Sequence, residues 1–172
     1  IIEAHIERGV VISTVDEYLK DIKLRIMVLR IRADHPLVRK DPVLPHRAAR
    51  AAYDEARKRH IRYDFAMDFK DPEEQFCSEV ASQAYSVYGI DLWRIRTTMS
   101  SVGIVTWLGD FGVRNFTTQA PADLEYDPQV SVVAEGRDRE TLWQAHVDDA
   151  VIDAMLEGAD MGDRLDCPVY LL

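Results

Sequence analysis

The segment FCSEVASQAYSVYG (76–89) constrains the fold of this chain more than any other part of the sequence. Its apolar side chains recur at helical spacing from Val80 to Tyr88, and Gly89 stands where a left-handed residue would end a helix. We therefore predict a helix with Cys77 at or within its first turn. The chain of 172 residues, 47% of them hydrophobic, is long enough to build one core, so we expect a single domain over residues 1–172.

The pattern of residues elsewhere predicts further strands and helices. Residues 1–13 are typical of two short strands with a turn at Glu7-Arg8-Gly9, and Ser13 or Thr14 caps a short helix through Leu19, because their oxygens satisfy free N–H groups of a first turn. The other predicted elements are a largely buried strand over 24–31, a loop marked by prolines over 36–45, a helix over 46–60, a loop over 61–75, a loop with short elements over 91–119, a strand over 129–135 and an amphipathic helix over 139–159. These elements predict an α+β fold, with an antiparallel sheet built from the strands near 1–13 and 24–31 packed against the cysteine helix.

Charge and composition exclude several classes of protein. The formal net charge of -9 repels a phosphate backbone, and no basic stripe compensates for it, so we expect no nucleic-acid partner. No apolar run approaches the ~20 residues that span a bilayer, and no signal-peptide pattern opens the chain. Cys77 and Cys167 have no metal-ligand spacing around them, so we expect no zinc site, and Cys167 is interpreted as an incidental thiol.

Cys77 stands where a nucleophile is favoured. A thiol attacks acyl carbons as its thiolate, and the unpaired N–H groups of a first helical turn favour that negative charge. A nucleophile of this kind also needs a base and a third group that orients the base. On the pattern alone, a small buried apolar cysteine is the more common alternative.

Four short motifs change this balance. They are Ile2-Glu3-Ala4, Gly9-Val10, Tyr63-Asp64 and Phe76-Cys77-Ser78-Glu79, in that order within residues 1–92. Together they resemble the permuted branch of the NlpC-like papain superfamily, the YiiX-like cysteine hydrolases related to lecithin retinol acyltransferases. The resemblance implies a circularly permuted papain-like fold, with Cys77 as the nucleophile and Glu3 as the residue that orients the catalytic histidine. That histidine lies on the preceding strand in the family, so we expect it upstream of Ile1.

Three further residues are candidates for the site. His5 follows Glu3 by two positions on one predicted strand, so both side chains point to the same face and His5 is a substitute base. The alternative for His5 is a partly exposed strand histidine. Asp64 either hydrogen-bonds a loop or lines the site, and Tyr63 precedes it in the Tyr-Asp motif.

Other polar residues near these motifs have structural interpretations. Ser78 and Glu79 are predicted to favour the start of the cysteine helix by capping, Glu79 through its charge. The remaining histidines are assigned to a loop (His35), a helix start (His46), a helix end (His60) and a helix face (His146).

The resemblance implies acyl transfer through an acyl-enzyme, with no metal or organic cofactor. The implied function is an amidase or peptidase acting on cell-wall-type peptides, and the alternative is a lipid acyl hydrolase or acyltransferase. Trp93, Trp107 and Phe111 build either an acyl-chain groove or, as we favour, a hydrophobic core. A catalytically inactive binding or regulatory module is a further alternative. A third is that residues 120–172, with their acidic helix, form an interaction surface for a partner, although an amphipathic helix usually packs on its own domain. Localisation stays open between the cytoplasm and the cell envelope, and the oligomeric state is not indicated.

Overall fold

A short β-hairpin opens the fold. In the computed structural model, which describes residues 1–20, 25–92 and 97–163, β1 (Ile2–His5) pairs antiparallel with β2 (Gly9–Ile12). The Thr14 side chain then caps α1 (Val15–Tyr18) by accepting the N–H of Glu17, whose carboxylate accepts the N–H of Thr14 in return at 2.8 Å. The two strands, their turn and the capped helix are confirmed as predicted.

Two helices follow where the sequence predicted a loop and one helix. The proline-marked segment contains α2 (Pro36–Lys40), and α3 (Leu44–Ala56) begins earlier and ends four residues before the predicted end. Pro45 fits the start of α3, because the first residues of a helix need no N–H partner. The helix stops because the N–H of Arg59 bonds the carbonyl of Ala56 in a tighter turn, and Arg59 has a left-handed φ of +52°.

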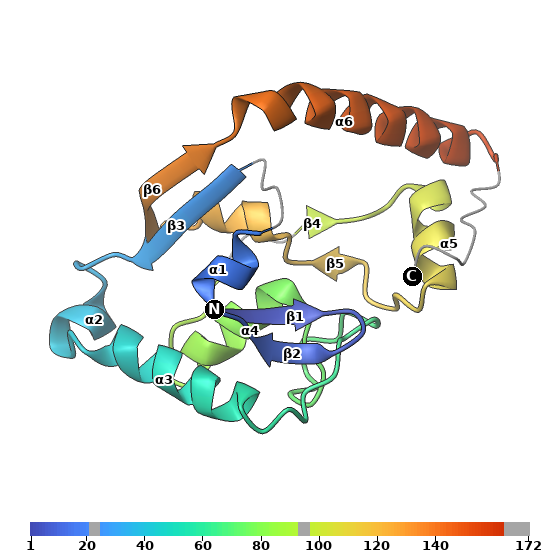
Figure 1. Ribbon diagram of the computed structural model, residues 1–172. Helices are drawn as coiled ribbons and strands as arrows, with labels where there is room; N and C mark the ends of the chain where they lie inside the picture. Colours follow the sequence, from blue (N-terminus) through green and yellow to red (C-terminus); the bar gives the residue numbers. More distant parts are fainter. Residues whose placement is uncertain (21–24, 93–96, 164–172) are drawn as a thin grey trace.

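The hairpin packs one face against α3 and α4 (Cys77–Ser86), as Figure 1 shows. The buried side chains of this cluster are Val10, Ala56 and Ile61, with Ile2, Ala4 and Val80 packed around them. Side chains alternate along a strand, so Glu3 and His5 project from the other face of β1.

A second cluster surrounds the end of α4. Its buried members are Val38, Leu44, Ile90, Leu92 and Val130, and Tyr85 and Tyr88 pack against them. Gly89 has a φ of +80°, as predicted for the residue that ends this helix. The N–H of Ile90 consequently returns to the Tyr85 carbonyl at 3.2 Å.

The strand predicted over 24–31 does not join the hairpin. Instead, β3 (Arg25–Ile31) pairs antiparallel with β6 (Val130–Arg137), and β4 (Thr97–Thr98) pairs with β5 (Thr117–Thr118). The described strands therefore form three separate two-stranded sheets, and the prediction of one sheet packed on the cysteine helix is wrong in this respect. β3 is also more exposed than predicted: Val28, for example, is 44% exposed. The reason is that a two-stranded ribbon leaves one face open to water.

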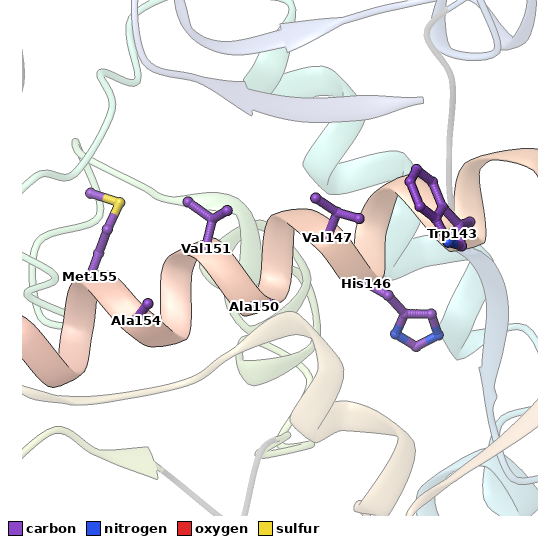
Figure 2. A pocket seen from close by; sticks show the side chains of 7 residues that line it. All are labelled: Trp143, His146, Val147, Ala150, Val151, Ala154 and Met155. Atoms are coloured by element: carbon purple, nitrogen blue, oxygen red, sulfur yellow. The ribbon is translucent and has the colours of Figure 1, made fainter.

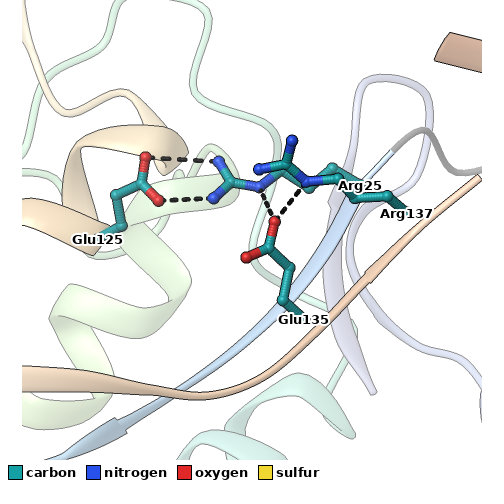
Figure 3. A network of polar contacts seen from close by, with 4 residues as sticks. All are labelled: Arg25, Glu125, Glu135 and Arg137. Carbon is teal, nitrogen blue, oxygen red and sulfur yellow. Dashed lines mark hydrogen bonds and ion pairs between the residues drawn. The ribbon is translucent and has the colours of Figure 1, made fainter.

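An ion-pair network attaches the β3–β6 ribbon to the 3-10 helix η1 (Pro121–Tyr126) (Figure 3). The Arg25 guanidinium donates to both carboxylate oxygens of Glu125, at 2.8 and 3.4 Å, and to Glu135 at 2.8 Å. Arg137 donates to the same Glu135 oxygen at 2.6 Å. Hydrogen bonds from these arginines hold the pKa of both carboxyl groups below the ordinary range.

The last helix, α6 (Arg139–Asp160), contacts α5 (Val102–Asp110) near its C-terminal end. Gly103 permits this approach, because a Cβ there would lie 2.4 Å from the backbone of Ala159. The predicted helix is confirmed, but much of its apolar side is exposed: Trp143, Val147, Val151 and Met155 lie along one side of it (Figure 2). No described helix is long and apolar enough to cross a membrane.

We predict that Gly9→Ala destabilises the protein. Gly9 has a φ of +66°, and a Cβ at this position would lie 2.1 Å from the carbonyl oxygen of Ile61. The left-handed conformation and the overlap together should lower the free energy of unfolding by about 2–3 kcal/mol. Thermal unfolding followed by circular dichroism measures the change. Gly136→Ala is the matched control, since a Cβ there meets nothing within 4 Å, and equal melting temperatures for the two variants would contradict the prediction.

Candidate active site

Cys77 is the first residue of α4, and its side chain is exposed. Phe76 precedes it in an extended conformation and donates its backbone N–H to Oε2 of Glu79 at 2.9 Å. Glu79 thus caps the start of the helix, as predicted, and the placement of Cys77 in the first turn is confirmed.

Ser78 does not cap the helix as predicted. It is buried, and its hydroxyl donates to the backbone carbonyl of Gln119 at 2.5 Å. This bond ties the first turn of α4 to the residues that follow β5. Sequence reasoning missed Gln119, because the contact joins residues 41 positions apart and no local pattern announces it.

Tyr63 lies close to Cys77. Burial raises the pKa of Tyr63, and negative charge on Cys77 raises it further. The Tyr63 ring also packs edge-on against Phe65, with 5.0 Å between ring centroids. The phenol is thus within electrostatic range of the thiol, and a phenol hydroxyl is a donor suited to a developing oxyanion.

Asp64 and Glu79 are buried, whereas Tyr63 is half-buried and Cys77 is exposed. Glu79 is 0% and Asp64 1% exposed. Burial, more than any other cause, raises the pKa of Glu79 to about 7, and the negative charges of Asp64 and Asp68 add to it. Asp64 is thus held in the interior below Tyr63.

Glu3 and His5 lie close to each other on β1. His5 Nε2 lies 3.8 Å from Glu3 Oε2, so the two side chains share a face of β1 as predicted. Arg8 also contacts the His5 ring, at 3.2 Å from Nδ1. Over residues 1–20, 25–92 and 97–163, the Cys77 thiol has one hydrogen-bond partner, the Ser78 hydroxyl at 4.0 Å, so neither Glu3 nor His5 is bonded to it.

The other histidines occupy structural positions away from the thiol. His35 accepts the N–H of Leu37 at the start of α2, and His46 lies in the first turn of α3. His60 follows α3 in a loop instead of ending it, with Nε2 3.9 Å from Glu55 Oε2. His146 lies on the exposed face of α6. Among the described residues no three His, Cys, Asp or Glu side chains form a metal-binding group.

Two predicted residues, Cys167 and Trp93, lie outside the described residues. Trp107 is partly buried and packs edge-on against Phe111, with 5.1 Å between centroids. Phe111 remains 38% exposed, so this aromatic pair is only partly covered.

A hollow of about 410 Å³ opens next to Tyr63. The hairpin turn and the segment after α3 form its walls, and Phe65 completes it. Its charged lining residues are Glu7, Arg8, Arg59, Arg62 and Glu74, with His60 beside them. Arg62 forms an ion pair with Glu74, whereas no ion pair is recorded for Arg59 in the described part of the chain. The hollow is therefore lined by more cations than anions, although the protein as a whole carries a net charge of -9.

An exposed cysteine at the first residue of a helix in an α+β domain fits nucleophilic catalysis, which also requires a base. The comparison with protein families agrees with it: a model described as permuted papain-like amidase enzyme, YaeF/YiiX, C92 family, matches residues 1–134. The chain belongs to this family, and the resemblance drawn from its motifs is confirmed. The permuted papain-like fold follows from that membership. No curated protein and no solved structure matched the chain.

Proposed function

We propose that this protein is a cysteine amidase or peptidase in which the Cys77 thiolate attacks the carbonyl carbon of an amide bond. The observation that carries the proposal is the exposed thiol at the first residue of α4, with Tyr63 within electrostatic range of it. Attack forms a C–S bond and a tetrahedral oxyanion. Backbone N–H groups of the first turn and the Tyr63 hydroxyl would donate to this oxyanion. The C–N bond then breaks, the amine leaves with a proton from the base, and water releases the acyl group.

The base in this proposal is a histidine on the strand that precedes the Glu-Ala strand in the family order. Glu3 would orient it, as the resemblance implies. His5 is the alternative base, and its 3.8 Å approach to Glu3 supports that assignment. The missing contact with Cys77 among the described residues counts against His5.

The lining of the hollow favours a peptide-like substrate that carries a carboxylate. Arg8 and Arg59 line the hollow next to Tyr63 and would pair with such a carboxylate. The lipid alternative is supported by an apolar cavity between the hairpin, α3 and α4, with a volume of about 240 Å³. That cavity is smaller than the ~300–1,000 Å³ of typical ligand pockets, so we place the amide substrate first.

A binding module without catalysis is the second candidate function. The exposed apolar side of α6 favours it, because Trp143 is 72% exposed and Val151 54% exposed on one helix. The two functions differ in whether the Cys77 thiol is required, and substitution of that thiol separates them.

Replacement of Cys77 by Ala should abolish amide hydrolysis and leave the fold intact. The side chain is exposed, so its truncation opens no cavity. Hydrolysis of amide substrates by the full-length protein and thermal unfolding are the two measurements. Ser82→Ala, one turn further along α4, is the control. Hydrolysis by Cys77→Ala at the rate of the control would contradict the proposed mechanism.

Glu3→Gln should slow hydrolysis without stopping it, because a residue that orients the base contributes less than the nucleophile does. We expect a lower kcat with the melting temperature almost unchanged, since Glu3 is not part of the buried cluster. Glu73→Gln, at an exposed position outside the hollow, serves as the control. A kcat equal to that of the control would show that Glu3 is only a structural residue.

Arg59→Asn should weaken the binding of carboxylate-bearing substrates. Asn tolerates the left-handed φ of +52° at this position, so the substitution removes the charge with little strain. A lost charge-assisted hydrogen bond corresponds to a roughly tenfold higher KM. The measurement compares a chromogenic glutamyl amide with its glutaminyl counterpart, and Arg50→Ala on the outer surface of α3 is the control. An equal change of KM for both substrates would contradict the assignment.

A further inference from the structure

The buried carboxyl groups of Asp64 and Glu79 lack the partners that buried charges normally require. Neither oxygen of Asp64 nor Oε1 of Glu79 has a hydrogen-bond partner in the described residues. Only Oε2 of Glu79 is satisfied, by the N–H of Phe76 at 2.9 Å. Two unpaired carboxylates in the interior would be strongly unfavourable, and buried charges are otherwise paired.

The surroundings of the two groups add negative charge. The titratable groups that act on them are Tyr63, Asp68 and Glu74, and no Lys, Arg or His forms an ion pair with either carboxyl in the described part of the chain. The backbone N–H groups of Ala66, Met67 and Asp68 partly offset the burial of Asp64, but without hydrogen bonds of normal geometry. A proton is the remaining way to neutralise one of the two groups.

We propose that Asp64 and Glu79 hold one proton between them, and that this shared proton positions Tyr63 and Cys77 relative to each other. Glu79 donates it from Oε1, the oxygen that has no other partner, and Asp64 accepts it. Oε2 of Glu79 keeps the Phe76 N–H, so both ends of the Glu79 carboxyl are used. The positioning role rests on the proposed function, whereas the shared proton does not.

The position of the pair explains this role. Asp64 directly follows Tyr63, and Glu79 holds the backbone N–H of the residue before Cys77. A hydrogen bond between the two carboxyl groups therefore connects the loop that carries the phenol with the first turn of the helix that carries the thiol. Loss of the proton leaves two negative charges in contact, which pushes the Tyr63 loop and the first turn of α4 apart.

The shared proton makes stability depend on pH in a defined direction. Burial and the neighbouring carboxylates raise the pKa of Glu79 from 4.5 to about 7. Between those values the folded protein retains a proton that the unfolded chain has lost, so the free energy of unfolding decreases as the pH rises through this range. Gln at position 79 removes the titration, because its amide donates to Asp64 at every pH.

The experiment compares wild-type protein with Glu79→Gln from pH 5 to pH 8. The difference in melting temperature, Glu79→Gln minus wild type, should grow by about 5 °C or more over this range. The rate of Cys77 alkylation by iodoacetamide, read by peptide mass, should show an additional step near pH 7 in the wild type, because loss of the shared proton displaces the first turn of α4, which carries the thiol. That step should be absent in Glu79→Gln. If Glu79 had only a structural role, the alkylation profiles of the two proteins would show no such difference near pH 7.

Two further variants complete the design. Glu73→Gln changes an exposed carboxylate close in sequence and should follow the wild type in both measurements. Asp64→Asn keeps a donor to Glu79 and removes the neighbouring negative charge, so the dependence on pH should be smaller than in the wild type and begin at lower pH. The proposal is overturned by parallel melting curves for wild type and Glu79→Gln, by alkylation profiles without a difference, or by failure of both Glu79→Gln and Asp64→Asn to fold. None of these readouts requires substrate hydrolysis, so an inactive wild-type protein with the expected pH dependence would refute the proposed function alone.

Discussion

The hydrogen bond from the N–H of Val10 to the carbonyl of Ile61, at 3.0 Å, is the contact on which the site depends. It fastens the hairpin to the chain that leaves α3, and it requires a glycine at position 9, since any Cβ there would strike the same carbonyl oxygen. The next residue, Arg62, donates its N–H to Glu73 and accepts the N–H of Gln75, each at 2.9 Å. These backbone hydrogen bonds connect β2, through Ile61 and Arg62, to the segment just before α4.

This chain of backbone bonds explains why separate motifs act together. The loop between Arg62 and Gln75 is closed at its base, so Tyr63 and Asp64 at its beginning lie next to Cys77 and Glu79 just after its end. Cys77 is exposed and Tyr63 is half-buried, whereas Asp64 and Glu79 are in the protein interior. Local hydrogen bonding, rather than a large sheet, thus assembles the candidate site.

Sequence reasoning succeeded where the signal was local. The hairpin, the Thr14 cap and the first-turn position of Cys77 each depend on residues within a few positions of one another. It failed where the partner was distant: β3 pairs with β6 about a hundred residues later, and Ser78 bonds Gln119 in place of its own helix. An antiparallel strand carries no mark of its partner, and a buried serine hydroxyl takes whichever acceptor the fold brings near.

The buried acid pair was invisible to the sequence for a related reason. Glu79 has the spacing of a helix cap and fulfils that role with Oε2. The capping pattern therefore predicts nothing about Oε1, the oxygen that is buried without a partner in the described residues. A cap on the surface would leave that oxygen in water, whereas here the Glu79 side chain is fully buried and Oε1 has no hydrogen-bond partner among the described residues. An arginine could neutralise both groups but would bring a larger, permanently charged side chain into a space next to Tyr63 and Phe76. A proton needs no volume and adds no net positive charge to the pair, and it leaves the first turn of α4 free to favour a thiolate at Cys77.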